Sequence, residues 1–363
     1  MFLQKYYPQV VNWDELRTIV VYQGKHLGDA LLITPVLAVL LKVSRADIYV
    51  CTTRANRPLV TDDSKVHYIE HRRGFLRALS TGLRIKNINP DLFLDFHDGL
   101  ESSIASFITR APTSLSVTSS SKKRFFKYVT HQVKYRSGMR RHRIDLNLDL
   151  LRRLGLEILP EQKHLDARFA LGSSRGRQHC NKQVSSLLVI HPGSRWLFKT
   201  PKIEFWIALL ERLKITGWTD ILLTGLLKSH EGVLLEELAR KSHAKLCPAD
   251  MSLRELSQTL AGARAYIGVD TFSSHLASAL RIPGVVLFGP SDELSWGPYE
   301  GSLLRAVSHS KLSCRPCNID GCGGGKRSEC LDSLDIDLVI NTFIDQVNYS
   351  NEAVEKINET ENF

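Results

Sequence analysis

Long hydrophobic runs are absent from this chain of 363 residues. No apolar stretch reaches the roughly 18 residues that a membrane-spanning helix needs, so we expect none. Residues 1–13 lack an apolar core behind a basic start, and we therefore expect no secretory signal. The apolar fraction of 43% and the charged fraction of 24% are typical of a soluble globular protein, with enough length for two domains.

Cysteine is scarce, and the seven cysteines are an odd number in a chain without an export signal. This count favours a reduced, cytoplasmic setting. Four of them lie in a glycine-rich loop, 314–330: Cys314, Cys317, Cys322 and Cys330. This cluster leaves two alternatives open, a structural zinc ion or free thiols and a disulfide. Cys51, Cys180 and Cys247 are scattered, which predicts packing roles.

Acidic residues are in deficit, since 48 Lys and Arg face 38 Asp and Glu, for a formal charge of +10. The surplus implies an anionic partner such as nucleic acid, phospholipid or a phosphorylated substrate. It is concentrated in segment 119–143, which has no acidic residue and is interleaved with aromatic side chains. The basic residues there are Lys122, Lys123, Arg124, Lys127, Lys134, Arg136, Arg140, Arg141 and Arg143. We expect this segment to bind a membrane surface, a phosphorylated lipid or single-stranded nucleic acid, with a merely solvated loop as the alternative.

Apolar strands alternate with helical stretches along both halves of the chain. We predict strands at 18–22, 46–51, 66–69, 92–95, 187–190, 220–224, 266–270 and 285–288. We predict helices at 31–42 (with a start near Thr34), 102–108, 145–156, 203–216, 231–241, 252–263 and 271–280. This α/β alternation predicts parallel sheets with helices on both faces, in two Rossmann-like domains.

The polar stretch 172–186 is typical of an interdomain linker. It separates an N-terminal domain, 1–171, from a C-terminal domain, 187–333. A C-terminal helix and tail occupy 334–363, with fraying expected beyond residue 348. Two such halves predict a site in the cleft between them.

Small and polar residues follow several of the predicted strands. Gly28 and Asp29 come after the first strand, with a spacing that departs from the dinucleotide fingerprint. Asp29 is either a residue at the mouth of a cleft or a helix N-cap. Asp270 and Thr271 begin a helix whose free N–H groups could hold a phosphate, or they cap an ordinary helix. Both positions are at carboxyl ends of strands, where ligands bind in parallel α/β sheets.

Several motifs occur in a fixed order. They are Gly28-Asp29, His191-Pro192-Gly193-Ser194 with Lys199, Gly268-Val269-Asp270-Thr271 with Ser274-His275-Leu276, Leu287-Phe288-Gly289-Pro290-Ser291, and Trp296. From about residue 18 to 338 the chain resembles glycosyltransferase family 9, the ADP-heptose:lipopolysaccharide heptosyltransferases, of GT-B fold with two Rossmann-like domains facing across a cleft. Phe198-Lys199 and the basic segment favour the third heptosyltransferase, which adds a branch heptose to the inner core.

The resemblance implies an inverting, metal-independent transfer of heptose from ADP-heptose to the inner core of lipopolysaccharide, with no cofactor required. Asp29 would be the general base, and Lys199 would stabilise the leaving ADP. The implied donor-binding residues are Ser194, Arg195, Glu231, Asp270, Thr271, Phe272, Ser274 and His275, the last with a more structural role. The implied acceptor-binding residues are Lys25, His26, Lys122, Lys123, Arg124, Arg140 and Arg141.

The resemblance also implies a setting. The enzyme would lie on the anionic inner face of the inner membrane of a Gram-negative bacterium, as a cytoplasmic, peripheral protein. No nucleic-acid partner is expected. Two alternatives stay open: a GT-B glycosyltransferase that uses another nucleotide sugar, and a non-enzymatic protein that binds polyanions through segment 119–143.

Overall fold

The computed structural model describes residues 11–59, 63–118, 129–134, 140–166 and 185–361. The chain divides into two compact units, Met1–Gly176 and Arg177–Phe363. The division falls inside the stretch 172–186 that we predict as a linker, which lies outside the described residues up to position 184. Within the described ranges, no helix is both long enough and apolar enough to cross a membrane.

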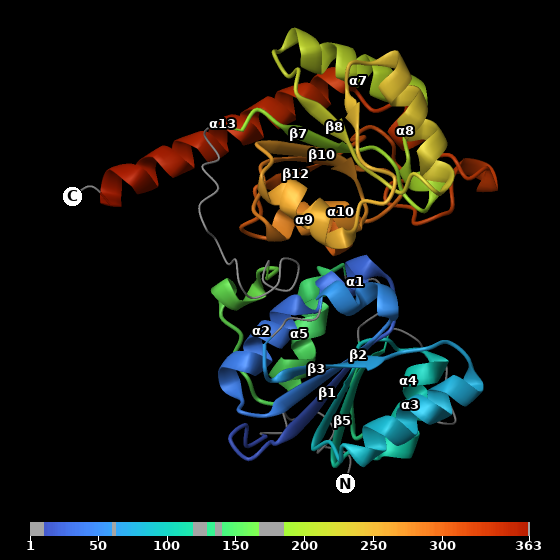
Figure 1. Ribbon diagram of the computed structural model, residues 1–363, viewed down its shortest axis with the longest axis vertical. Helices are drawn as coiled ribbons and strands as arrows, with labels where there is room; N and C mark the ends of the chain where they lie inside the picture. Colours follow the sequence, from blue (N-terminus) through green and yellow to red (C-terminus); the bar gives the residue numbers. More distant parts are fainter. Residues whose placement is uncertain (1–10, 60–62, 119–128, 135–139, 167–184, 362–363) are drawn as a thin grey trace. The chain divides into compact units, whose positions relative to one another are not determined.

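Unit 1 is built on a parallel sheet with the strand order β3-β2-β1-β4-β5-β6 among its described residues (Figure 1). The strands are β1 (Thr18–Gln23), β2 (Asp47–Thr52), β3 (Val66–Glu70), β4 (Leu92–Asp95), β5 (Thr113–Thr118) and β6 (His131–Lys134). The order reverses between β1 and β4, which makes a topological switch point at their carboxyl ends. β1 is buried from Ile19 to Gln23, as a central strand covered on both faces should be.

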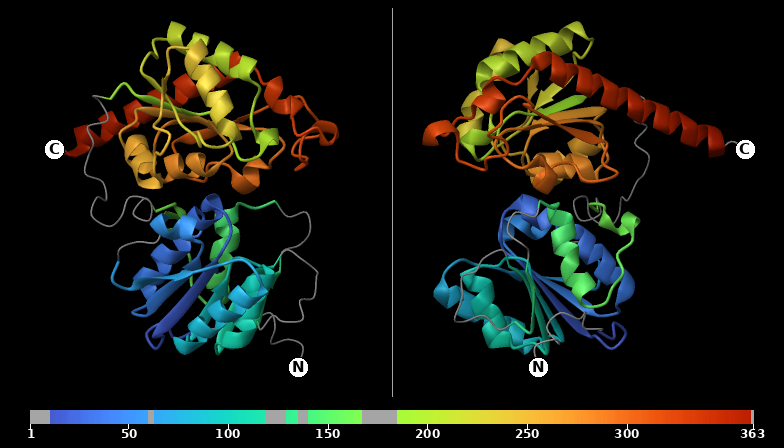
Figure 2. Two further views of the ribbon diagram at one scale, coloured as in Figure 1. Left: turned by 45° about the vertical axis from the view of Figure 1, so that its right-hand side comes forward. Right: turned by 180° about the vertical axis from the view of Figure 1, so that it is seen from behind.

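Two layers of helices cover the sheet of unit 1 (Figures 1 and 2). The helices are α1 (Leu27–Leu31), α2 (Thr34–Val43), α3 (Phe75–Asn87), α4 (Leu100–Thr109) and α5 (Arg143–Arg153), with short 3-10 turns η1 (Arg54–Leu59) and η2 (Pro160–Lys163). Helices α2 and α5 pack together on one face, and α3 and α4 on the other. Pro35 lies in the first turn of α2, where its missing N–H costs nothing. The start near Thr34 that we predict for the helix 31–42 is confirmed, since α2 begins at Thr34, and the short helix α1 precedes it.

Unit 2 repeats the winding, with the parallel order β12-β11-β10-β7-β8-β9. Its strands are β7 (Leu188–His191), β8 (Ile221–Leu223), β9 (Lys245–Leu246), β10 (Ala265–Val269), β11 (Gly284–Phe288) and β12 (Leu304–Ser308). Here the switch point lies between β7 and β10, which pair directly. The GT-B fold that we predict, with a Rossmann-like sheet in each unit, is confirmed.

Helices of unit 2 also lie on both faces of its sheet. They are α7 (Ile203–Ile215), α8 (His230–Lys241), α9 (Leu253–Ala261), α10 (Phe272–Ala279), α11 (Glu293–Trp296), α12 (Glu329–Asp332) and α13 (Ile336–Glu361), with 3-10 turns η4 (Leu197–Lys199) and η5 (Cys322–Gly324). Side chains of α7, α8 and α13, including the fully buried Trp206 and Phe343, share one core with the strands. Figure 1 shows α9 and α10 on the opposite face.

One prediction on the elements is wrong. The helix α13 continues to Glu361, although we expect fraying beyond residue 348. Residues 348–361 include four glutamates, a residue type that favours the helix. Within the basic segment 119–143, β6 pairs with β5, so the alternative of a merely solvated loop does not hold for His131–Lys134.

Candidate functional site

The switch point of unit 2 brings two predicted site residues into direct contact. Lys199 follows β7 at the end of η4, and Asp270 follows β10. The Lys199 Nζ lies 2.5 Å from the Asp270 Oδ2. The side chain of Asp270 is only 6% exposed and that of Lys199 21%, so this ion pair is largely shielded from water. A cation therefore stands at the position where ligands bind in a doubly wound sheet.

The start of α10 is a tightly bonded turn beside this pair. Thr271 is the N-cap, and its hydroxyl oxygen accepts from the Ser273 N–H at 3.1 Å. The Ser274 hydroxyl donates to the Thr271 carbonyl oxygen at 2.7 Å, and the Tyr266 hydroxyl donates to Ser273 Oγ at 3.0 Å. Phe272 is the first helical residue. His275, on the same helix, is buried.

Glu231 is buried at the start of α8, between the loops that follow β7 and β8. Its Oε2 accepts from the Leu226 N–H at 3.1 Å. A Cβ on Gly193 would lie 3.0 Å from the Glu231 side chain, and one on Gly225 also 3.0 Å from its Oε2. The two glycines thus leave the space that this carboxylate occupies. A buried acid at this edge of the sheet can accept hydrogen bonds from ligand hydroxyls.

The turn after β7 presents a second basic side chain. The Ser194 N–H donates to Thr200 Oγ1 at 3.1 Å, and the Trp196 N–H donates to Ser194 Oγ at 3.2 Å. This turn leaves Arg195 exposed, with its guanidinium 5.4 Å from the centroid of the Trp196 ring. Ser194 is itself buried, and its carbonyl oxygen accepts from His230 Nε2 at 2.9 Å.

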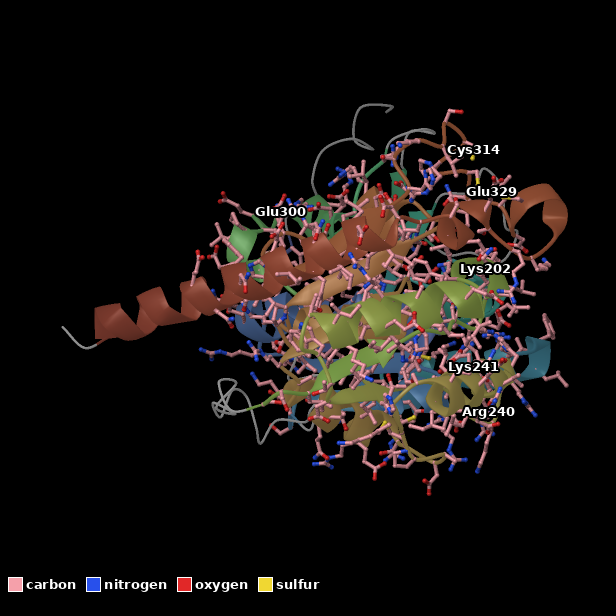
Figure 3. The ribbon with its side chains drawn as sticks, turned by 90° about the horizontal axis from the view of Figure 1, so that it is seen from above. Lys202, Arg240, Lys241, Glu300, Cys314 and Glu329 are labelled. Atoms are coloured by element: carbon pink, nitrogen blue, oxygen red, sulfur yellow. The ribbon has the colours of Figure 1, made fainter. Side chains whose placement is uncertain are left out.

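The cysteine-rich loop does not form a metal site as the structure places it. Its cysteines are free thiols: Cys314 is exposed (Figure 3), Cys322 is also exposed, Cys317 is half-buried and Cys330 is buried. Throughout the described ranges, no group of three or more His, Cys, Asp or Glu side chains is placed to hold a metal ion. Burial raises the pKa of the Cys330 thiol to about 11, which keeps it protonated at neutral pH. These cysteines do not fit a tetrahedral zinc ion in this arrangement.

The same loop supports the switch point of unit 2 by other contacts, which the sequence did not reveal. The Ser328 hydroxyl donates to the Phe198 carbonyl oxygen at 2.7 Å, directly before Lys199. Arg315 Nε donates to the Gly289 carbonyl oxygen at 2.7 Å, after β11. Its Nη2 lies 2.8 Å from Glu293 Oε2. The loop thus braces both the β7 side and the β11 side of the switch point.

Asp29 lies in the first turn of α1, at the carboxyl end of β1, and is partly exposed. His26 is the N-cap of this short helix. Lys25 is half-buried beside it, and burial lowers the pKa of its ammonium group, with the Arg143 charge acting in the same direction. Asp29 and Asp95 act in the opposite direction, so Lys25 stands among carboxylates at the unit 1 switch point.

Two histidines that the sequence analysis missed lie at the same edge. His71 follows β3 and His97 follows β4, and their ring centroids are 5.2 Å apart. The Tyr22 hydroxyl is hydrogen-bonded to His71 Nδ1 at 2.8 Å. A Cβ on Gly24 would lie 2.7 Å from the His71 ring, so only glycine fits there without a shift. The signal available in the sequence was a histidine within two residues of the end of each of two strands.

Burial keeps both imidazoles neutral. It lowers the pKa of His71 to about 4 and also lowers that of His97. The His71 Nε2 and the His97 Nδ1 are buried without a hydrogen-bond partner among the described residues. Buried polar atoms of this kind are rare, and they can serve a ligand or a bound water.

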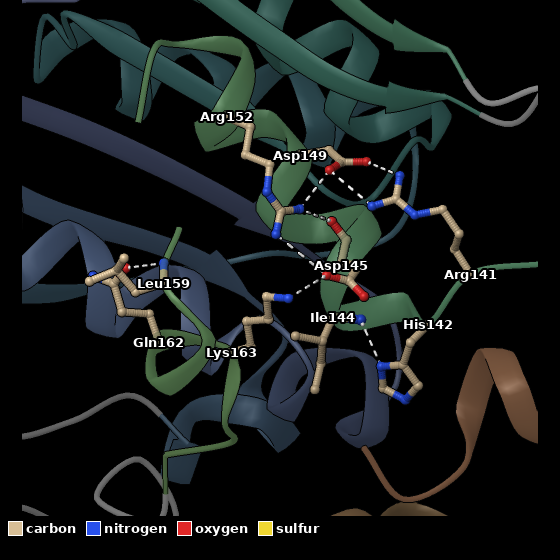
Figure 4. A network of polar contacts seen from close by, with 9 residues as sticks. All are labelled: Arg141, His142, Ile144, Asp145, Asp149, Arg152, Leu159, Gln162 and Lys163. Carbon is tan, nitrogen blue, oxygen red and sulfur yellow. Dashed lines mark hydrogen bonds and ion pairs between the residues drawn. The ribbon is translucent and has the colours of Figure 1, made fainter. Parts of the chain in front are cut away.

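The predicted acceptor arginines differ in their surroundings. Arg141 is held by Asp149, with Nη1 to Oδ2 at 2.7 Å and Nη2 to Oδ1 at 3.2 Å (Figure 4). Arg152 shares the same carboxylate at 2.7 Å, which ties Arg141 into the network along α5. Arg140 is exposed. Lys122, Lys123 and Arg124 lie outside the described residues.

Two doubly wound parallel units, each with its polar residues at the switch point, define the class of GT-B glycosyltransferases. The family model of glycosyltransferase family 9 (heptosyltransferase) matches residues 78–326, well over half of the chain. The chain belongs to glycosyltransferase family 9.

Curated relatives carry heptosyltransferase names. Lipopolysaccharide heptosyltransferase 1 of Pseudomonas aeruginosa is 36% identical over 132 residues, which cover 36% of this chain and 36% of the relative. Lipopolysaccharide heptosyltransferase 3 of Escherichia coli is 26% identical over 183 residues, which cover 49% of this chain and 53% of the relative. The chain thus spans between about a third and a half of the length of these relatives.

Solved structures of the same fold match over more of the chain. The E. coli ADP-heptose lipopolysaccharide heptosyltransferase II matches with a TM-score of 0.69 and 16% identity, over 93% of this chain and 100% of that chain. An E. coli heptosyltransferase solved with ADP-2-deoxy-2-fluoro heptose matches with a TM-score of 0.62 and 19% identity, over 80% and 92% of the two chains.

Proposed function

We propose that this protein transfers heptose from ADP-heptose to the inner core of lipopolysaccharide, with inversion and without a metal ion. The observation that carries the proposal is the Lys199–Asp270 pair at the switch point of unit 2, in a chain of family 9. A fixed cation at this point can neutralise a diphosphate leaving group, which many glycosyltransferases assign to a metal. The names of the relatives, and the heptose nucleotide bound in one related structure, support this donor.

The reaction is a single displacement at the anomeric carbon of the donor sugar. The acceptor hydroxyl oxygen attacks this carbon while the bond to the diphosphate oxygen breaks, which inverts the configuration. Asp29 takes the hydroxyl proton as general base. The products are the lengthened acceptor and ADP.

Residues of unit 2 hold the donor. Lys199 and Arg195 offset the charge that develops on the diphosphate, and Asp270 keeps the Lys199 ammonium group in position. The backbone at Thr271 and Phe272, at the start of α10, accommodates phosphate oxygens. The carboxylate of Glu231 accepts hydrogen bonds from the ribose hydroxyls. The remaining donor residues, Ser194, Ser274 and His275, form part of the same donor-binding site.

Residues of unit 1 hold the acceptor. Lys25, His26 and Arg140 bind phosphate groups of the inner core, together with Lys122, Lys123 and Arg124. Arg141 acts through its contact with Asp149 on α5. The acceptor is a lipid-anchored saccharide, so we place the enzyme at the anionic cytoplasmic face of the inner membrane.

The test is ADP release from ADP-heptose with a panel of truncated lipopolysaccharide acceptors, in the presence of EDTA. We expect turnover in the wild type and a loss of about 10²–10⁴-fold in kcat for Asp29→Asn, which keeps the shape but not the base. Lys199→Gln should lower kcat by a factor on the order of 10²–10³. Asp47→Asn, at the amino end of β2, is the control and should keep full activity.

Each outcome has a definite meaning. The acceptor that supports turnover identifies the sugar position. Activity that disappears with EDTA and returns with a metal ion would overturn the metal-independent mechanism. ADP release in Asp29→Asn at the wild-type rate would remove Asp29 from the role of base. No ADP release with any acceptor would exclude ADP-heptose and favour another nucleotide sugar.

A further inference from the structure

Helix α3 turns a stripe of leucines toward solvent. Its buried side consists of Ala78, Thr81, Gly82 and Ile85, which pack on unit 1. Leu76 and Leu83 are seven residues apart and hence on one stripe, almost opposite that buried side. They are 77% and 54% exposed. The outward stripe of a surface helix is normally polar, so this placement needs an explanation.

The neighbouring helix adds to this surface. Helices α3 and α4 pack against each other on one face of the sheet, as Figures 1 and 2 both show. Leu100 and Phe107 of α4 are exposed, as is Phe75 at the start of α3. We call these five residues the α3–α4 apolar patch: Phe75, Leu76, Leu83, Leu100 and Phe107. Exposed apolar patches on helices mark surfaces that bind a partner.

Basic residues occur along α3 and in the turn before it. Residues 71–90 contain no acidic residue but five basic ones: Arg72, Arg73, Arg77, Arg84 and Lys86. Arg77 and Arg84 are again seven residues apart and lie beside the leucine stripe. The acidic neighbours are Glu70, which pairs with Arg72 at 2.8 Å, and Glu101 on α4. The surface therefore carries a net positive charge next to its apolar side chains.

This combination favours a lipid surface over a protein. The core of a protein–protein interface is depleted of charged residues, whereas here an arginine directly follows each leucine of the stripe. A basic, amphipathic helix suits the boundary between anionic headgroups and acyl chains. There the leucines enter the acyl region while the arginine side chains reach up to the phosphates.

We propose that the α3–α4 apolar patch docks unit 1 onto a bilayer of anionic phospholipid. The loop from β3 to α3 starts at the carboxyl edge of the sheet, the same edge at which β1 leads to Asp29. Docking through α3 therefore holds the acceptor end of unit 1 close to the membrane. Only this role in catalysis rests on the proposed function; the binding of lipid does not.

The experiment measures co-sedimentation of the full chain with vesicles of phosphatidylcholine, alone or with phosphatidylglycerol added. The double variant Leu76→Ser, Leu83→Ser removes the apolar stripe. The double variant Arg77→Gln, Arg84→Gln removes the charges beside it. The matched controls lie in unit 2: Ile215→Ser with Val233→Ser, at 75% and 70% exposure, and Arg240→Gln with Lys241→Gln on α8 (Figure 3).

We expect the wild type to bind vesicles that contain phosphatidylglycerol. Each patch variant should bind at least about tenfold more weakly, since each basic side chain and each inserted apolar side chain contributes to partitioning. Both controls should bind like the wild type. All substituted side chains are exposed, so unchanged circular dichroism will show that the variants fold.

Two results would overturn the proposal. One is wild-type lipid binding in Leu76→Ser, Leu83→Ser. The other is a wild type whose vesicle binding does not increase when phosphatidylglycerol is added. If light scattering then shows that the leucine variant has lost self-association, the patch would be assigned to a second copy of the chain. ADP release with a water-soluble, delipidated acceptor separates the two proposals. The patch variants should keep this rate, and its absence in the wild type would remove the transferase function while the vesicle result stands.

Discussion

His71 is a single buried side chain whose protonation opposes folding. Burial, followed by the neighbouring His97, lowers its pKa to about 4, against 6.5 in the unfolded chain. Glu101 acts in the opposite direction and Arg73 in the same one. Between pH 6.5 and 4 the unfolded state therefore binds more protons than the folded state. Stability is full above pH 6.5 and falls as the pH is lowered, by up to about 1.4 kcal/mol per pH unit for this one group.

The substitution His71→Asn tests this linkage. Asn keeps a hydrogen-bond acceptor near the position of Nδ1 for the Tyr22 hydroxyl, but it does not titrate. We expect a variant that is less stable at pH 7 and whose stability falls less steeply between pH 6.5 and 5, measured by urea unfolding at each pH. His67→Asn, on the half-exposed side of β3, is the matched control. A slope that is unchanged in His71→Asn would contradict the lowered pKa.

At this scale the sequence identifies charged residues better than neutral ones. Asp29 and Asp270 could be singled out because each comes after a strand end, whereas Lys199 was assigned through the family resemblance. The structure pairs Lys199 with Asp270. His71 and His97 could not, because a neutral buried histidine is recognised only by its surroundings. The partner of Arg141 was also hidden, since its contact with Asp149 depends on how the chain enters α5.

The element that leads from β1 to α1 depends on one glycine. A Cβ on Gly24 would lie 2.7 Å from the His71 ring, a distance that real Cβ contacts do not reach. Gly24→Ala should therefore displace the ring or the turn and lower the free energy of unfolding by about 1–3 kcal/mol. It should also lower kcat, because the same turn carries Lys25 and Asp29.

The control for this element is Gly262→Ala at the end of α9. There the nearest atoms to the new Cβ are 3.7 Å away, an ordinary contact, so stability should change by less than about 0.5 kcal/mol. Urea unfolding of the three proteins at pH 7 provides the comparison. Equal midpoints for Gly24→Ala and the wild type would show that the turn has more room than the His71 ring leaves.

The elements that could be predicted are those with a continuous apolar run. Strands β1, β4, β7 and β11 are buried throughout or nearly so, and their runs of apolar side chains indicate this burial in the sequence. The missed strands are β5, β6, β9 and β12, which are polar or short and lie toward the outer positions of their sheets. Their pairing depends on neighbours distant in sequence, which the local pattern does not contain.

At the scale of the whole molecule, each unit holds its own set of candidate site residues. Lys199, Glu231 and Asp270 all belong to unit 2, and their contacts described above are with other residues of that unit. Helix α13 packs on β11, β12 and α7, so it completes the core of unit 2 at the end of the chain. Asp29 belongs to unit 1.

The fragment Ser185–Phe363 should therefore fold alone and bind ADP. We expect calorimetry to give a Kd within about tenfold of that of the full chain, because a change of 1.4 kcal/mol corresponds to that factor and the ion pair is retained. The fragment should transfer no heptose, because it lacks Asp29, the proposed general base. Lys199→Gln in the fragment should weaken ADP binding, while Lys202→Gln, three residues further along, should not. A fragment with native circular dichroism that fails to bind ADP would mean that unit 1 supplies part of the donor site.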